Sequence, residues 1–420
     1  MPHLAPSTTP QRASAPGAAE RHPGFQIGWD HARFALDVPA STGAAAQLLQ
    51  QGWRAAKAVF GPRTRRATPQ VRQWLALRTT AWQRGEAFDD GQITPNVLAR
   101  LAVSQCPVTG DALTHDTGGA ADAVIERANP QAGWAAGNLL MFSRRVQVAR
   151  GALDWRAALE RARQPETSTG AEAVIGGLRA HEWLRLAVLM SFATPLAHAT
   201  ACALPLVVLP PPRLRVLNPA QALQVLLTLR FVLGAQPARL DEIGRLLPED
   251  ARGEFFVLGT TLMARRIAAG SDEQPALRHA MALAWRQPLV QQRWQRLALR
   301  LDALSCERVV QAAVARGLAG RQLRCLSLAQ ATEGWALPGG VQAPHAVQRL
   351  LPPRAPCQDE GLTLPAMPIH RARRSPGARP VPRRVDLPAA PGSVSARSAV
   401  NAPLLHAAAA AVAAAVATAS

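Results

Sequence analysis

Hydrophobic residues recur every three to four positions along most of this chain, the spacing that gathers them on one face of an α-helix. From residue 171 to about residue 335 one helical pattern follows another. The clearest stripe near the N-terminus is formed by Val71, Trp74, Leu75, Ala81 and Trp82. Helices are predicted at 44–60, 69–85, 96–101, 152–163, 223–233, 254–269, 289–304 and 305–317.

A different pattern occupies residues 106–151. Two short apolar runs, 123–125 and 139–142, have the length of β-strands, and residues typical of turns lie between them: Asn129, Pro130, Gly133 and Gly137. Ser143 is suited to cap the start of a helix and Gly151 to end it, because Ser accepts hydrogen bonds from first-turn N–H groups and Gly tolerates a left-handed backbone. We therefore expect a strand–turn–strand–helix unit here.

These patterns predict a mainly α fold with a small ββα unit in its N-terminal half and an all-helical C-terminal half. A polar segment at 165–170 predicts a linker between the halves. The ends of the chain hold too few large apolar residues to fold alone, so disordered N- and C-terminal tails are expected. The predicted parts are a tail at 1–24, a basic helical region at 25–165 with the ββα unit at 106–151, a helical domain at 171–337 and a tail at 338–420.

The segment 186–209 carries no formal charge and is long enough to span a membrane. Pro195 and Pro205 interrupt it, however, and amphipathic segments rather than further spans follow. A pair of buried core helices is the preferred interpretation, and a membrane anchor is the alternative.

Aromatic and charged residues are mixed at 25–38, the first segment expected to be ordered. Asp30 beside His31 suggests an acid/base or metal-binding pair. The preferred interpretation is that Trp29 and Phe34 anchor the segment and that His31 is exposed.

The chain has 47 basic and 28 acidic residues, a formal net charge of +19. Lys57 is the only lysine, but an exchange of Lys for Arg leaves this sum unchanged. Such an excess favours polyanionic partners, either nucleic acid or an anionic membrane surface. The basic residues are dense at 51–100 and at 371–384, where they predict contacts to phosphates; a merely solvated basic face is the alternative.

The five cysteines contain no C-x-x-C pair, which argues against a zinc site made of Cys alone. The first 24 residues also lack the apolar run of a signal peptide. A reduced, cytoplasmic setting is therefore expected. The cysteines are Cys106, Cys202, Cys306, Cys325 and Cys357.

Five short motifs follow one another in 106–151: Cys106-Pro107-Val108-Thr109-Gly110, Glu126-Arg127-Ala128-Asn129-Pro130, Gly133-Trp134, Gly137-Asn138-Leu139 and Ser143 to Gly151. In this order they resemble the ββα-metal unit of HNH-type endonucleases, in the divergent branch that bacterial and phage proteins often carry. The resemblance implies a site in which a general base, usually His, activates water and a divalent metal (Mg²⁺ or Mn²⁺) stabilises the leaving oxygen.

The chain departs from this pattern at the positions that carry the chemistry. Glu126 and Arg127 stand where the family has Asp and His, and Arg stays protonated and cannot act as a base. Gln147 stands where the helix would supply a metal ligand, and a neutral amide is a poor one. Asn138, which the resemblance implies orients the base and the hairpin loop, is retained.

Glu126 remains a candidate metal ligand, and His115 is a candidate for a displaced base. Alternatively these residues are structural: Glu126 and Arg127 pair or face solvent, Asn138 fixes the turn and Gln147 caps the hairpin. The candidate contacts to nucleic acid are Arg63, Arg65, Arg66, Arg144, Arg145 and Arg150.

Three functions are compatible with these observations. The preferred one is a nucleic-acid-binding protein, with DNA or another nucleic acid as the expected partner, built on a degenerate HNH-like ββα unit without efficient cleavage. The first alternative is an active metal-dependent endonuclease that hydrolyses phosphodiester bonds. The second is a helical interaction protein or membrane-associated protein that works through 171–335.

Overall fold

The protein is described here from a computed structural model. The structure describes residues 22–40, 43–164, 174–234, 237–319 and 323–337, and the backbone of 346–350. All of these belong to one compact unit, which ends at Cys357. The predicted linker at 165–170 and most of both predicted tails lie outside the described residues.

The N-terminal part of the described chain is helical, as its hydrophobic pattern predicts. Three of these helices begin with Pro. Pro suits the first helical position because it lacks an N–H group, and an N–H group there would have no partner within the helix. Thr68 and Thr94 cap two of them by accepting hydrogen bonds from the N–H groups of Val71 and Val97. The helices are α2 (Pro23–Arg33), α3 (Gly43–Phe60), α4 (Pro69–Gln83) and α5 (Pro95–Ala99).

Helices α2 and α3 approach each other so closely that their backbones touch. A Cβ atom on Gly28 would lie 2.0 Å from the carbonyl oxygen of Leu49, and one on Gly52 would lie 1.9 Å from that of Phe25. A side chain at either glycine would therefore force the two helices apart.

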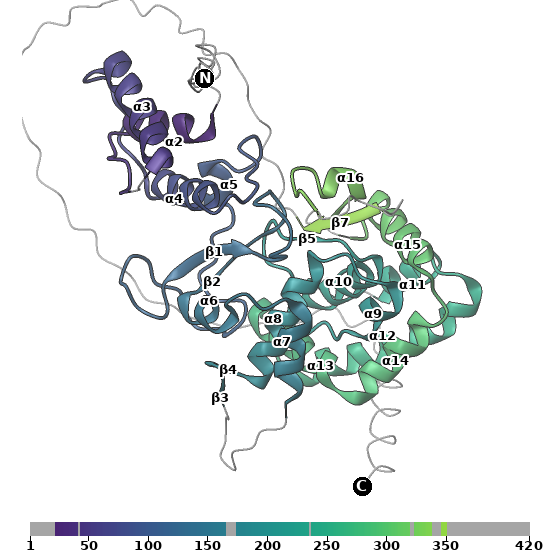
Figure 1. Cartoon of the computed structure of the whole chain (residues 1–420). Helices are drawn as coiled ribbons and strands as arrows, with labels where there is room; N and C mark the ends of the chain where they lie inside the picture. Colours follow the sequence, from purple (N-terminus) through teal and green to yellow (C-terminus); the bar gives the residue numbers. More distant parts are fainter. Residues whose placement is uncertain are drawn as a thin grey trace, which may run out of the picture. The chain divides into compact units, whose positions relative to one another are not determined.

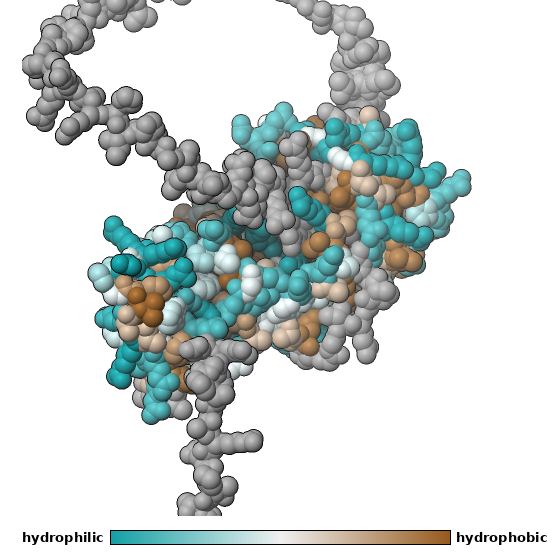
Figure 2. All heavy atoms as spheres, turned by 90° about the horizontal axis from the view of Figure 1, so that it is seen from above, coloured by the Kyte–Doolittle hydropathy of each residue, from teal (hydrophilic) through white to brown (hydrophobic). Residues whose placement is uncertain are grey.

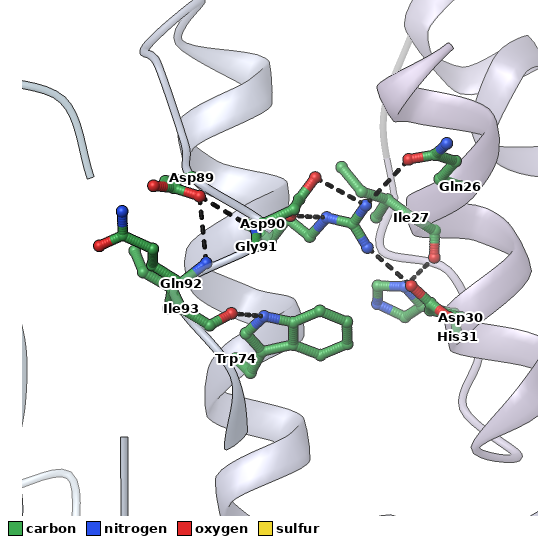
Figure 3. A network of polar contacts seen from close by, with 11 residues as sticks. Gln26, Ile27, Asp30, His31, Trp74, Asp89, Asp90, Gly91, Gln92 and Ile93 are labelled. Carbon is green, nitrogen blue, oxygen red and sulfur yellow. Dashed lines mark hydrogen bonds and ion pairs between the residues drawn. The ribbon is translucent and has the colours of Figure 1, made fainter. Parts of the chain in front are cut away.

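A buried arginine on α4 ties the N-terminal segments together (Figure 3). Arg78 donates to Asp30 of α2 at 2.6 Å and to Gln26 at 3.3 Å, and its Nε lies 2.6 Å from the carboxylate of Asp90 in the loop after α4. Burial raises the pKa of Asp90, and the guanidinium of Arg78 opposes that rise. His31 is buried, and its Nδ1 lies 2.8 Å from the carbonyl oxygen of Ile27, so the expectation that it is exposed was wrong.

The strand–turn–strand–helix prediction is confirmed (Figure 1). Strands β1 (Ala123–Arg127) and β2 (Leu139–Ser143) pair antiparallel, and α6 (Arg144–Arg150) continues directly from β2. Gly151 ends the helix with a φ of 50°.

The start of α6 is capped differently from the prediction. Ser143 holds the N-cap position, but its side chain makes no capping hydrogen bond. Instead the N–H of Arg144 donates to the backbone carbonyl of Asp122, and the N–H of Arg145 donates to that of Ala120, both at 2.8 Å. The loop before β1 therefore replaces the cap.

Strand β2 is buried on both faces, and its side chains alternate between two cores. Leu140 and Phe142 join the main core, which extends from Cys106 to Trp335. Leu139 and Met141 join a second core, which includes Ala81, Ile93, Leu98, Leu101, Ile125 and Trp134. The hairpin thus lies between the N-terminal helices and the helical C-terminal half.

The C-terminal half is mostly helical, which confirms the mainly α class. Helix α10 is buried at every position and lies at the centre of this half. The helices are α7 (Trp155–Arg163), α8 (Ala180–Phe192), α9 (His198–Ala203), α10 (Pro219–Val232), α11 (Pro237–Gly244), α12 (Glu249–Ala268), α13 (Gln274–Arg286), α14 (Pro288–Ala298), α15 (Ala303–Ala315) and α16 (Leu328–Ala331).

This half also contains short strands that the sequence did not predict. Strands β3 and β4 form a hairpin, and the other three form an antiparallel sheet in the order β5-β7-β6. Strands β3, β4 and β5 have two residues each and are too short to show an alternating pattern. Their bounds are β3 (Val174–Ile175), β4 (Leu178–Arg179), β5 (Arg215–Val216), β6 (Leu323–Ser327) and β7 (Ala346–Leu350).

One predicted helix does not exist as a single element. The chain breaks between α14 and α15, so the expected continuous stripe at 289–304 was wrong. Its two end positions, Leu289 and Leu304, are exposed. Trp294 and Leu297 are buried within α14, and Leu301 is buried in the loop between the two helices.

The segment 186–209 forms two helices, α8 and α9, which are separated around Pro195 as predicted. In the part of the chain that the structure describes, none of the helices combines the length and the apolar character needed to cross a bilayer. The face seen in Figure 2 is mainly hydrophilic, with hydrophobic residues in small groups.

The Arg78 network predicts a large cost for one substitution. Arg78→Ala would leave the carboxylate of Asp30 half-buried without its cation, so the free energy of unfolding should fall by about 3 kcal/mol. Arg72→Ala, at an exposed position of the same helix, should change it by less than about 0.5 kcal/mol. Urea denaturation of the full chain measures both. Equal stabilities would mean that the network does not hold α2 on α4.

Candidate functional site

The loop between β1 and β2 is organised by the side chain of Asn138. This amide is fully buried. Its oxygen accepts from the N–H of Asn129 at 2.8 Å, and its nitrogen donates to the carbonyls of Asn129 and Gly133, both at 3.0 Å. The N–H of Asn129 and the carbonyl of Gly133 have this side chain as their partner, while the carbonyl of Asn129 also accepts from the N–H of Ala132 at 3.2 Å.

The helical half holds the same loop from the outside. Asn129 donates to the carbonyl of Ala193 at 3.3 Å, the N–H of Arg215 donates to the carbonyl of Gly137 at 3.0 Å, and the indole of Trp335 donates to that of Ala136 at 3.2 Å. Gly137 has a φ of 92°, and a Cβ there would lie 2.3 Å from the side chain of Arg215. Only glycine fits this position without strain.

Arg127 points away from the helix of the ββα unit. Its guanidinium donates to Glu86 at 2.7 Å and to the carbonyl of Ala132 at 3.1 Å, and it lies 5.2 Å from the ring centroid of Trp134. Successive side chains of a strand face opposite sides. Arg127 therefore does not share a face with Glu126.

Glu126 faces α6 and is already engaged there. The amide nitrogen of Gln147 donates to a carboxylate oxygen of Glu126 at 2.7 Å. One turn further along α6, Arg150 is 4% exposed, and its Nε has no hydrogen-bond partner. Burial lowers the pKa of Arg150, and the charge of Glu126 opposes that shift. The structure thus brings together two predicted catalytic positions, Glu126 and Gln147, and places the buried cation of Arg150 beside them.

These residues do not fit a divalent metal. A metal ligand must offer a lone pair, whereas Gln147 turns its N–H donor towards Glu126 and Arg150 adds a positive charge. Within the described ranges, no group of three or more His, Cys, Asp or Glu side chains could hold a metal ion. The Mg²⁺ or Mn²⁺ implied by the resemblance therefore has no suitable set of ligands here.

His115 lies on an exposed loop before β1. Asp122 orders this loop by accepting from the hydroxyl of Thr117 at 2.6 Å, from that of Thr114 at 2.7 Å and from the N–H of Gly118 at 2.7 Å. These hydrogen bonds hold the pKa of Asp122 well below its usual range. His115 itself makes no hydrogen bond to a described residue, and no contact brings it to Glu126.

The three predicted nucleic-acid contacts on α6 differ in their exposure. The side chain of Arg144 is 50% exposed and lies 3.9 Å from the carboxylate of Asp122. Arg145 is engaged with Glu182 at 3.1 Å and with the carbonyl of Gly177 at 3.0 Å. Since Arg150 is buried, Arg144 is the best placed of the three to meet a ligand.

The N-terminal helices present a larger basic surface. Eight of the nine basic residues at 51–100 are exposed, and none of the eight pairs with a carboxylate of the described residues. This set, called the basic surface below, comprises Arg54, Lys57, Arg63, Arg65, Arg66, Arg72, Arg84 and Arg100. Only three of its members were named from the sequence, although the local excess of basic residues was a signal for the others.

The acidic residues of 51–100 are used inside the structure and do not neutralise this surface. Glu86 accepts from Arg127 and from the indole of Trp134, both at 2.7 Å. Asp89 caps the following turn, and Asp90 pairs with Arg78. None of these three carboxylates pairs with a cation of the basic surface, and the exposed Asp37 lines a pocket together with Arg72 of that surface.

The chain has no match among known proteins. No family model matches it, and no curated protein or solved structure is significantly similar to it. Its function has to be inferred from its own residues, above all from the ββα unit and the basic surface.

Loss of the Asn138 amide should destabilise the whole fold. Asn138→Ala leaves two buried backbone groups, the N–H of Asn129 and the carbonyl of Gly133, without this partner, so the free energy of unfolding should fall by at least about 2 kcal/mol. Asn96→Ala, at an exposed position of α5, is the matched control and should change it by less than about 0.5 kcal/mol. Urea denaturation tests both, and an unchanged midpoint for Asn138→Ala would contradict the assigned role.

Proposed function

We propose that this protein binds nucleic acid through its basic surface, beside an HNH-like ββα unit that serves as a scaffold and does not cleave. The observation that carries the proposal is the uncompensated charge of the basic surface. Eight exposed cations without carboxylate partners can each contact a phosphate and release a bound counterion, which is the main source of affinity for a polyanion.

The state of the ββα unit supports binding without cleavage. Hydrolysis of a phosphodiester needs a group that takes a proton from water. Arg127 stays protonated and is committed to Glu86, while the carboxylate of Glu126 already accepts from Gln147. Arg127 therefore cannot act as the base, and one carboxylate oxygen of Glu126 is held by the helix instead of facing open solvent.

The position of the hairpin supports a scaffolding role. Strand β2 contributes to both cores. The loop between β1 and β2 contacts the loop that follows α4 through the backbone of Trp134, and it contacts the helical half through Asn129. A unit with these contacts contributes to the stability of the fold whether or not it carries catalytic residues.

Removing part of the basic surface should weaken duplex binding and its dependence on salt. The variant Arg63→Gln/Arg65→Gln/Arg66→Gln removes up to three phosphate contacts, and each contact contributes about 0.9 to the slope of log K against log[salt]. We expect that slope to fall in magnitude by about 2 to 3. Fluorescence anisotropy with a labelled DNA duplex over a salt series measures it.

The matched control changes three exposed arginines of the helical half, Arg296, Arg300 and Arg316, to Gln. Both triple variants lose the same total charge. A larger loss of DNA affinity in the 63/65/66 variant would therefore come from the place of the lost charges and not from their number. Equal losses in the two variants, or a wild-type affinity that is insensitive to salt, would contradict the proposal.

The absence of cleavage is tested separately. Supercoiled plasmid incubated with the full chain and either Mg²⁺ or Mn²⁺ should remain intact, because Arg127 stays protonated at the position of the base and Glu126 is hydrogen-bonded to Gln147. Gel electrophoresis detects nicking. Nicking that disappears in Glu126→Ala would instead establish the alternative, a working endonuclease, whereas nicking that persists would not come from this site.

A further inference from the structure

One face of α2 forms an open pocket of about 460 Å³. Five of its lining residues share a helical face, and the sixth comes from α4. They are Phe25, Gln26, Trp29, Asp30, Arg33 and Arg78. This pocket is separate from the ββα unit and contains both aromatic rings and cations.

The aromatic residues at this pocket form a continuous cluster. The rings of Phe25 and Trp29 are stacked at 28°, with centroids 6.2 Å apart, and the ring of Phe60 meets Trp29 edge-on at 5.5 Å. All three are only partly buried. The chain has no Tyr and few aromatic residues. A partly exposed aromatic cluster is unusual in such a chain, because aromatic rings that serve only the hydrophobic core are normally buried.

The charges around the pocket select the kind of ligand. Arg78 is shared between the carboxylates of Asp30 and Asp90, whereas Arg33 pairs with no carboxylate of the described residues. A positively charged ligand therefore finds no unpaired carboxylate among the lining residues, and an anionic group finds the guanidinium of Arg33. A planar ring that carries an anionic group is attracted by both the aromatic faces and the cation.

The basic surface begins where the aromatic cluster ends. Phe60 is the last residue of α3, and the loop 61–66 that follows contains Arg63, Arg65 and Arg66. The N–H of Arg65 donates to the carbonyl of Arg33 at 2.9 Å, which holds this loop beside the end of α2. Cations therefore continue from the pocket into the adjoining loop.

We propose that this aromatic platform binds single-stranded nucleic acid, with an unpaired base stacked on Trp29 and Phe25 and the adjoining phosphates on Arg33 and the 61–66 loop. The proposal rests on the proposed function and names its substrate class. Every base has a flat face that can stack on an aromatic ring, so little sequence preference is expected. In a duplex these faces are covered by neighbouring base pairs.

The test compares a labelled oligothymidylate of about 16 nucleotides with a DNA duplex, using fluorescence anisotropy and the full chain. Trp29→Leu keeps an apolar contact for Phe60 and removes the stacking surface. We expect its affinity for the single strand to fall ~5- to 150-fold, with less than about a twofold change for the duplex. Phe256→Leu, an exposed aromatic position on α12, is the control and should change neither.

Phe25→Leu is the second variant, to be used if Trp29→Leu lowers the unfolding midpoint. It should show the same selective loss for the single strand. An unchanged single-strand affinity in a folded variant, or an equal loss for both probes, would overturn the platform. If the wild-type chain binds neither probe, the proposed function itself fails; if it binds the duplex through the basic surface but shows no selective loss, only the platform fails.

Discussion

A backbone loop can enter a protein core only if its N–H and C=O groups find partners there, and this constraint governs the molecule. The loop between β1 and β2 meets it mainly through the amide of Asn138. The helical half then adds contacts from Trp335 and from the backbone of Arg215. Residues distant in sequence converge on this loop. The hydrogen bonds that they make to its backbone connect the helical half to β1 and β2, and these strands in turn pack against the N-terminal helices.

The distribution of charge follows from the same arrangement. Near the hairpin, carboxylates are used to satisfy buried donors: Glu86 serves Arg127 and Trp134, and Asp90 serves Arg78. These carboxylates are therefore paired with donors other than the cations of the basic surface. The excess of positive charge on the exposed helices is a consequence of how the acids are bonded as much as of composition.

Much of the fold could be predicted from the sequence, because helices and caps are set by residues close together in the chain. The boundaries of α3 and α4, the hairpin and the end of α6 at Gly151 follow from apolar spacing and turn residues. What could not be predicted depends on partners far away in the chain. Arg78 is spaced like any solvated arginine, His31 is buried only because α3 and α4 pack over α2, and the pairing of Gln147 with Glu126 depends on strand register.

The contact between α2 and α3 through Gly28 and Gly52 has a consequence for how the pocket on α2 can behave. Main-chain atoms have no rotamers, so the spacing of the two backbones that carry Trp29 and Phe60 is fixed at this contact, and only the rotamers of the two rings remain adjustable. For a ligand of the proposed kind, such a backbone is preorganised and gives up little conformational entropy on binding. Two residues without side chains thus set how closely the helices under the pocket approach each other.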